Sequence, residues 1–544
     1  MWEEVDEMKA AELITKKIRE LNDDMVDAAR NVSLDVDDDT LLADLARWAA
    51  RRCGEDEEEV LREVKAWAET WGDNDSLFAT LRCILELGDE CNKERDNPPP
   101  PWKFREFLGF RGMEERNEWY KKRVHITIHR GTGQIGGSVT EINMGETNIL
   151  VDFGSSLPGS QAAISDDELI KKIFHRRYHP IDAVFFTHYH GDHTGLIDKI
   201  PKEIPIYMDE NMLEIMRVLH RHTGSTVMQD LLANRDGRIH DLKSGQTIAL
   251  KDMSITPFFV DHSAYHANMF LFEGAGHTIL HSGDFRSTGY TGRSVEIVPR
   301  LIREKISQVD VLICEGTMMT RSVKEEHLLT ERKLQEEVSA YMQDHRQLFV
   351  VCSSTNFDSL SSICQAARAN QLSIYANDYM VDMLKTFRKI AGRYKKEYRL
   401  PFVHTIGELK EQRPKECVVL LGSLLNKKIE DAYTLYERYG SYMSEFNPCL
   451  LYSMWRGYLN SDHAAYNEGL AKFVKRFGGQ VNYAHSTGHA DKKTLAKFIE
   501  DVAPRKYIVP LHTENPEGFK ELEIENKYKD MVILPKDGWT IEVR

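Results

Sequence analysis

Three histidines and an aspartate directly follow an apolar run, and this feature constrains the fold more than any other. The pattern H-x-H-x-D-H begins at His188, and the run Ala183–Phe186 before it has the character of a buried strand. Imidazole nitrogen and carboxylate oxygen are the ligands that zinc takes at catalytic sites. Residues two apart in an extended or tightly turned backbone project to the same side. His188 and His190 can therefore share one metal ion while Asp192 and His193 turn toward a second.

This pattern is the signature motif of the metallo-β-lactamase superfamily, and further motifs of the chain resemble that family in the expected order. The family has an α/β fold, an αββα sandwich with a dinuclear metal site at its edge. The resemblance implies that Asp152 orients the metal ligands without binding the metal itself. It also implies that His262 and His512 are ligands and that Asp284 bridges the two metal ions. The stretch around His512 is similar to the strand-end motif of ribonuclease J. His266 is the alternative to His262, whereas His277 and His281 are expected in packing or surface roles.

The resemblance implies a centre of two Zn²⁺ ions, with Mn²⁺ as an alternative. Asp284 would bridge the two ions, and the other ligands would divide into two sets: His188, His190 and His262 for one ion, and Asp192, His193 and His512 for the other. Metal coordination lowers the pKa of water from 15.7 to about 7, which produces a nucleophile at neutral pH. The expected chemistry is therefore hydrolysis.

Several features resemble the β-CASP subgroup, in which a second α/β domain is inserted into the sandwich. The match implies that Glu315 and Asp192 belong to the catalytic set and that His489 is the proton donor. It also implies substrate contacts: His485 and Thr487 with the scissile phosphate, and Ser353 and Ser354 in the insertion. Ser359 stands where relatives usually carry an arginine, which predicts weaker phosphate binding in the insertion.

The acidity of the chain lies entirely at its front. Residues 1–100 contain 13 Lys+Arg and 28 Asp+Glu, a net charge of −15, while the rest carries 58 of each sign. Apolar residues at helical spacing and then four consecutive prolines predict a separate domain and a semi-rigid linker. The expected domains are an acidic helical domain, a proline-rich connector, the first part of the sandwich, the β-CASP insertion and the last part of the sandwich: 1–96, 97–122, 123–324, 325–478 and 479–544.

The substrate predicted from these motifs is RNA, most simply a single strand. RNA-cutting β-CASP members have histidine at the position of His512, whereas DNA nucleases of the group usually have valine. A DNA nuclease, a small-molecule ester, thioester or lactone hydrolase, and an inactive binding subunit remain alternatives. The last is disfavoured because all seven ligands are present. Endonuclease and 5′-exonuclease action both stay open, and the chain has only 32 residues after His512, where ribonuclease J has a further domain.

The composition of the chain favours a reducing compartment. The sequence has no apolar run long enough to span a membrane and no secretory signal, and its eight cysteines form no C-x-x-C pair. We therefore expect a cytoplasmic protein without a membrane partner, with oligomer formation open. The acidic front segment predicts a docking module for another protein or a solubilising domain, with an autoinhibitory mimic of nucleic acid as the alternative.

Overall fold

The computed structural model describes residues 124–543, except for short gaps and one longer gap. The gaps are 158–163, 176–179, 224, 307, 322–328, 392–397, 399, 413, 415, 423–448, 464 and 479–480. The chain divides into two compact units, residues 1–121 with 538–540 and residues 122–537 with 541–544. The predicted acidic domain 1–96 and connector 97–122 lie outside the described residues, so both stay predictions.

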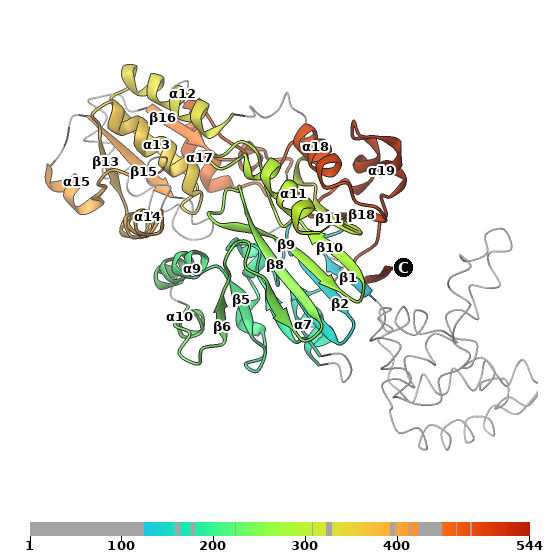
Figure 1. Ribbon diagram of the computed structural model, residues 1–544. Coiled ribbons are helices and arrows are strands. Elements are labelled where there is room, and N and C mark those ends of the chain that lie inside the picture. Colours follow the sequence, from blue (N-terminus) through green and yellow to red (C-terminus); the bar gives the residue numbers. More distant parts are fainter. Residues whose placement is uncertain are drawn as a thin grey trace, which may run out of the picture. The chain divides into compact units, whose positions relative to one another are not determined.

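Two sheets form the core of the larger unit (Figure 1). The first has the order β19-β1-β2-β3-β4-β5-β6, and the second β18-β11-β10-β9-β8-β7. The strands of the first sheet are β1 (Val124–Arg130), β2 (Val139–Met144), β3 (Thr147–Val151), β4 (Ala183–Phe185), β5 (Ile206–Met208), β6 (Ile239–Asp241) and β19 (Trp539–Val543). Those of the second are β7 (Ile248–Leu250), β8 (Met253–Val260), β9 (Ala267–Gly274), β10 (His277–His281), β11 (Val311–Glu315) and β18 (Tyr507–Leu511).

One hydrophobic cluster fills the space between the two sheets. Its members alternate along the strands, as Val124, Ile126 and Ile128 do in β1, because successive side chains of a strand point to opposite faces. Phe185 of β4 meets Phe270 of β9 across the sandwich, with ring centroids 5.8 Å apart. Buried apolar surface on both sheets therefore fixes which ends of the strands come together.

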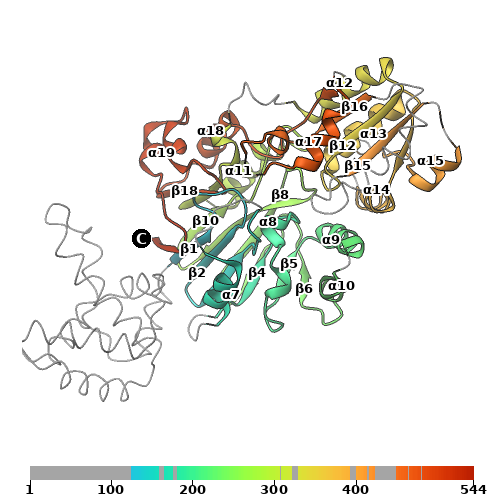
Figure 2. The ribbon, with the colours of Figure 1, turned by 180° about the vertical axis from the view of Figure 1, so that it is seen from behind.

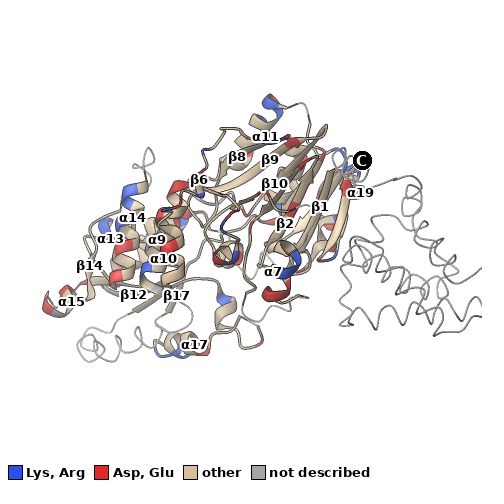
Figure 3. Ribbon diagram, turned by 90° about the horizontal axis from the view of Figure 1, so that it is seen from below, with Lys and Arg blue, Asp and Glu red and all other residues tan. Residues whose placement is uncertain are grey.

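Helices cover the outer faces of both sheets. They are α7 (Asp166–Phe174), α8 (Gly191–Thr194), α9 (Glu210–Thr223), α10 (Thr226–Leu232), α11 (Ser294–Lys305), α18 (Lys492–Val502) and α19 (Asn526–Asp530), with 3₁₀ turns η2 (Ile197–Lys199), η3 (Thr317–Thr320) and η7 (Pro516–Glu521). Helix α7 begins with a capping box between Ser165 and Glu168. Its first turn is acidic and its last turn basic, which suits the helix dipole (Figure 3).

A third sheet, entirely parallel, is built from the chain between β11 and β18. Its order is β14-β13-β15-β12-β16-β17. Its strands are β12 (Gln347–Cys352), β13 (Ser373–Ala376), β14 (His404–Thr405), β15 (Cys417–Gly422), β16 (Cys449–Ser453) and β17 (Val481–Tyr483). The helices around it are α12 (Glu331–Asp344), α13 (Phe357–Ala369), α14 (Asp378–Ile390), α15 (Ile406–Gln412) and α17 (Glu468–Lys475), with the turn η6 (Arg456–Leu459). Figure 2 shows this sheet beside the sandwich, where α14 packs against α9.

The predicted α/β class is confirmed, and the apolar run that precedes His188 contains strand β4 (Ala183–Phe185). Residues 275 and 276 make the tight turn between β9 and β10, and both have the positive φ that a type I′ turn requires (46° and 78°). The insertion limits 325–478 stay a prediction. Within the described part of the chain, every helix is too short or too polar to cross a bilayer.

Candidate metal centre

The predicted ligands lie just beyond the carboxyl ends of strands from both sheets. His188 follows β4, His262 follows β8, Asp284 follows β10 and His512 follows β18. Strand β11 pairs in parallel with β18, so that Glu315 is level with Leu511. Because these strands are buried and hydrogen-bonded to their neighbours, the side chains at their ends start from a rigid frame.

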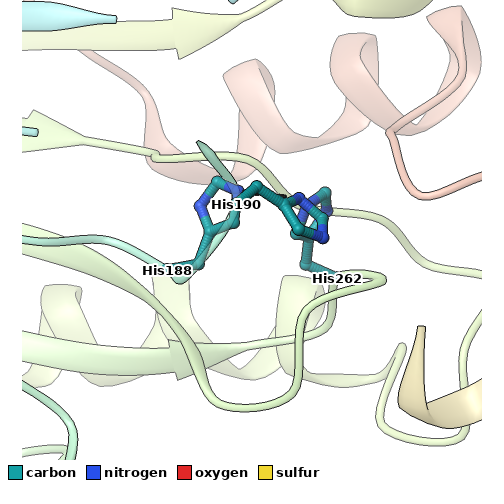
Figure 4. Close-up of side chains that lie close together, drawn as sticks. All are labelled: His188, His190 and His262. Atoms are coloured by element: carbon teal, nitrogen blue, oxygen red, sulfur yellow. Dashed lines mark hydrogen bonds between the residues drawn. The ribbon is translucent and has the colours of Figure 1, made fainter. Parts of the chain in front are cut away.

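Three histidines form the first cluster, shown in Figure 4. His188 Nε2 lies 3.1 Å from His190 Nδ1, and His262 Nε2 lies 3.3 Å from the same atom. His188 and His262 are buried and His190 is half-buried. One ion can bind all three nitrogens, which lie within 4.8 Å of one another. The cluster joins the first sheet to the second, because His188 and His190 come from the loop after β4 and His262 from the loop after β8.

Asp192, His193 and His512 form the second cluster, and their ligand atoms also lie within 4.8 Å of one another. His512 Nε2 is 3.2 Å from Asp192 Oδ2. Asp284 Oδ2 lies between the clusters: it is 3.2 Å from His193 Nε2, 3.8 Å from His512 Nε2 and 3.9 Å from His188 Nε2. This position is compatible with a bridging carboxylate.

The ligand nitrogens are oriented by hydrogen bonds on the opposite side of each ring. His193 Nδ1 is 2.7 Å from Asp152 Oδ2, and His512 Nδ1 is 2.8 Å from the Thr317 hydroxyl. His262 Nδ1 donates to the carbonyl oxygen of Gly488 at 2.5 Å. Among the described residues, the buried His193 Nε2 has no hydrogen-bond partner. A histidine with one nitrogen held and the other directed at carboxylates is typical of a metal ligand, so these residues fit a divalent ion.

Two of these residues have unusual backbone conformations. Asp152 has φ 61° and His512 has φ 53°, in the left-handed region that non-glycine residues rarely adopt. The Asp152 carboxylate accepts hydrogen bonds from the backbone N–H and the hydroxyl of Thr187, both at 2.8 Å. Local strain of this kind persists where the surrounding structure over-determines the backbone, and it is common at functional sites.

The electrostatics of the site divide it into two parts. Burial, followed by the neighbouring histidines, holds the pKa of His188 and His262 well below the usual range, and burial lowers the pKa of His190 to about 4 against the opposing charge of Asp192. Burial opposes ionisation of Asp284, but His512 and His193 outweigh it and lower the pKa of this carboxyl. In the second cluster the neighbouring aspartates outweigh burial and raise the pKa of His193 and His512. Neutral imidazoles and ionised carboxylates are the forms that bind metal, so the first cluster and Asp284 favour the binding forms, whereas His193 and His512 would release protons on binding an ion.

His489 lies beside both clusters, half-buried, at the end of the loop after β17. Its Nδ1 is 3.3 Å from the Glu315 carboxylate and 3.8 Å from Asp284 Oδ2. The ring centroid is 5.1 Å from that of His262 and 5.7 Å from that of His512. Glu315 is buried and also accepts hydrogen bonds from the backbone N–H groups of Phe285 and Ala490. Glu315 therefore ties the His489 loop to the strand that carries Asp284.

The residues predicted to contact substrate differ from one another in burial and in hydrogen bonding. The Thr487 hydroxyl accepts from the backbone N–H of His489 at 3.3 Å, so it shapes this loop. His485 Nδ1 is buried without a hydrogen-bond partner in the described structure, and burial lowers the pKa of its imidazole to about 4. Ser354 is buried and donates to the Tyr379 hydroxyl, whereas the Ser353 hydroxyl is 3.2 Å from that of Thr355. Their predicted contacts with substrate stay predictions.

The structure also separates the histidines between which the sequence left a choice. His266 faces Asp209, with Nδ1 3.2 Å from Oδ2, and it belongs to neither cluster, whereas His262 does. His277 pairs with Asp310 at the far end of β10. His281 is buried and accepts from the backbone N–H of Gly283. The packing roles expected for His277 and His281 agree with these contacts.

Arg286 is an important residue that the sequence reasoning missed. It is fully buried and contacts three carboxylates: Asp261 at 3.2 Å, Glu331 at 3.1 Å and Asp358 at 2.8 Å. It also donates to the carbonyl oxygen of Thr487 at 2.9 Å. Glu331 and Asp358 begin helices of the third-sheet region, so one guanidinium joins that region to the loops beside the metal clusters. Thr187 and Thr317, which adjoin motif residues, were missed as well.

Comparison with known proteins agrees with the geometry. Residues 147–350 match the model of the beta-lactamase superfamily domain. An RNase J-like protein of Methanocaldococcus jannaschii is 24% identical over 266 residues, which are 47% of this chain and 55% of that protein. Ribonuclease J of Helicobacter pylori is 26% identical over 170 residues (30% and 24%), and that of Mycobacterium tuberculosis is 26% identical over 202 residues (36% and 34%).

These matches span between about a quarter and about half of the relatives' own lengths. Among solved structures, a protein of unknown function from Enterococcus faecalis V583 superposes with a TM-score of 0.58 at 18% identity, covering 77% of this chain and 100% of that one. At this identity the superposition supports the fold alone. Residues 147–350 thus match a beta-lactamase superfamily domain, and the chain is similar to ribonuclease J over part of its length.

Proposed function

We propose that the protein is a metal-dependent hydrolase that cleaves phosphodiester bonds of RNA, as an endonuclease, a 5′-exonuclease or both. The observation that carries the proposal is the position of His489, with Glu315 on one side and both candidate metal clusters beside it. A small-ester hydrolase would account for the candidate metal ligands but not for the third-sheet region or for the stretch from His485 to His489. The names of the curated relatives favour RNA, and so does the histidine at position 512.

The proposed cofactors are two Zn²⁺ ions, with Mn²⁺ as an alternative, held by the two clusters and Asp284. When bound, such ions supply Lewis acidity, which makes a water-derived nucleophile available at neutral pH and offsets the charge of the phosphoryl oxygens. Asp152, Thr317 and the Gly488 carbonyl keep the ligand rings in place. We also propose that the third-sheet region is a β-CASP insertion at 325–478.

His489 is the proposed general acid for the departing ribose oxygen. Its Nδ1 faces Glu315, so Nε2 remains to carry a proton toward the substrate. Glu315 acts by fixing the orientation of this ring and the loop around it. The imidazole of His485 and the hydroxyl of Thr487 are the proposed groups that would hold the phosphate in line for attack.

The test uses the purified full-length chain with single-stranded RNA labelled at either end and with DNA of matching sequence. Elemental analysis should find about two transition-metal ions per chain, and chelation should abolish RNA cleavage until metal is restored. The two labels distinguish internal cuts from stepwise loss at the 5′ end. Preference for DNA would move the assignment to a DNA nuclease. Hydrolysis of a thioester or lactone without nucleic-acid cleavage would exclude the proposal.

A further inference from the structure

Tyr189 lies between two candidate metal ligands, and none of the roles above explains its side chain. It separates His188 from His190 in the motif, and it is 2% exposed. Its hydroxyl donates to the carbonyl oxygen of Thr355 at 2.7 Å, in the loop between β12 and α13 of the third-sheet region. The same hydroxyl accepts from the backbone N–H of Tyr265 at 2.9 Å. Burial raises the pKa of Tyr189, so the phenol keeps the proton that it donates.

These two hydrogen bonds join three segments that are far apart in the sequence. Tyr189 lies in the loop after β4 and Tyr265 in the loop after β8, and both loops contribute to the first histidine cluster. The Tyr265 ring also packs edge-on against Phe357, the first residue of α13, with centroids 4.5 Å apart. The two loops that supply the first cluster therefore meet the third-sheet region at one buried hydroxyl.

The loop that Tyr189 contacts, residues 353–356, follows the carboxyl end of β12, a central strand of the parallel sheet. The Ser353 hydroxyl accepts from the backbone N–H of Thr355 at 3.3 Å, and the two hydroxyls are 3.2 Å apart. Asn356 then caps α13 by accepting from the backbone N–H of Ser359 at 3.1 Å. These contacts set the shape of the loop, whereas the hydrogen bond from Tyr189 sets its place relative to the first cluster. Ligands of parallel α/β sheets bind beyond the carboxyl ends of the strands, where this loop lies.

We propose that Tyr189 is a positioning residue that fixes the 353–356 loop beside the first cluster, so that this loop holds the RNA strand that is cleaved there. This inference rests on the proposed function and adds to it a residue that acts through the loop. A loop that is fixed before the substrate arrives loses less conformational freedom on binding. Phenylalanine at position 189 would keep the buried ring but remove the donor to Thr355 and the acceptor for Tyr265.

The experiment measures turnover of the full-length chain on two substrates. Tyr189→Phe should raise the KM for a single-stranded RNA about tenfold, the size of one lost buried hydrogen bond, with kcat nearly unchanged. Bis(p-nitrophenyl) phosphate has one phosphodiester and no strand for the loop to hold. The ratio of kcat/KM on RNA to kcat/KM on bis(p-nitrophenyl) phosphate should therefore also fall about tenfold. An equal loss on both substrates would mean that Tyr189 only braces the fold and would overturn the inference.

Tyr290→Phe is the matched control. The Tyr290 hydroxyl also joins the sandwich to the third-sheet region, but through helices: it donates to Gln335 of α12 at 2.9 Å and lies 3.0 Å from the Ser362 hydroxyl of α13. Losing these contacts should leave the KM for RNA unchanged. The same rise in KM in both variants would show a general loss of packing and would count against a specific role of Tyr189.

Hydrogen–deuterium exchange tests the position of the loop without any substrate. Tyr189→Phe should speed amide exchange in residues 353–356 and leave that of α12 unchanged, because only the loop loses its hydrogen bond to the motif. Unchanged exchange in the loop would overturn the inference. Failure of the unmutated protein to bind or cut RNA would instead refute the proposed function, and the exchange result would still decide whether Tyr189 holds the loop.

Discussion

Replacing Arg286 with methionine tests how the third-sheet region is held to the metal-binding sandwich. Methionine keeps much of the volume of the side chain but removes the guanidinium from among Asp261, Glu331 and Asp358. It also leaves the Thr487 carbonyl without this donor. Three carboxylates then remain in a site from which water is excluded. We expect a large loss of stability, together with a displaced loop around His489.

The magnitude follows from burial. Arg286 is 0% exposed and Glu331 is 0% exposed, so little solvent screens the charges that remain. Removing one partner of a buried ion pair destabilises a protein by about 3–5 kcal/mol. For a region of this size we expect the unfolding midpoint to fall on the order of 10 °C. Arg346→Met is the matched control, because its pair with Glu416 is partly exposed and such pairs contribute about 0–1 kcal/mol.

The loss of stability caused by Arg286→Met should also depend on pH. Burial, only partly offset by Arg286, already raises the pKa of Glu331, and methionine at 286 removes the group that lowers it. A carboxyl whose pKa is raised on folding stabilises the folded state below its unfolded pKa, and that contribution disappears as pH rises through its folded pKa. Differential scanning fluorimetry should therefore find a smaller deficit at pH 5 than at pH 8, with partial recovery in Arg286→Met/Glu331→Gln. A midpoint within 2 °C of the unmutated protein at pH 8 (roughly the effect of 1 kcal/mol or less) would refute the reasoning.

Three further predictions concern the site and the front segment. His489→Ala should slow RNA cleavage by about 10²- to 10⁴-fold with metal content retained, and unchanged turnover would point to His485 instead. Asp152→Asn replaces the carboxylate that holds His193 and should weaken zinc affinity about 10- to 100-fold in competition with a chelating dye; equal affinity would contradict the supporting role. Removing residues 1–101 should raise activity, more so at low salt, if the acidic segment occupies the active site; an activity ratio near one at every salt concentration would leave only the docking role.

The sequence was sufficient to predict the strand before His188 and the cluster of polar side chains after it because both signals are local, whereas metal binding by these residues stays a prediction. An apolar run of strand length followed by clustered histidines can be recognised within ten residues, as at Ala183–Phe186 and His188. The choice of His262 over His266 needed family order, since both are histidines in one short loop. The structure separates them by what each ring faces: a ligand cluster for His262 and Asp209 for His266.

Contacts between distant segments could not be predicted in the same way. Arg286 has no distinguishing neighbours in the sequence, because Glu331 and Asp358 are 45 and 72 residues away. Gly154 resembles any turn glycine, yet a β-carbon there would overlap the backbone carbonyl of Asp192. The Arg321 guanidinium, just after η3, stacks on the Trp455 ring, just before η6, and only the fold brings these two segments together. In each case the determining interaction is a tertiary contact with no periodicity to reveal it.

The wide separation of the ligands along the chain has a consequence for biosynthesis. His188 and His512 are 324 residues apart in the sequence (512 − 188). The strand before His512 pairs in parallel with β11, nearly 200 residues earlier in the chain. Parallel pairing over such a distance forms late, because the intervening loop must close first. A nascent chain therefore presents the first histidine cluster long before the second can exist. The second cluster is completed only when the segment around His512 has been made and has paired, so an incomplete chain lacks the full set of candidate ligands.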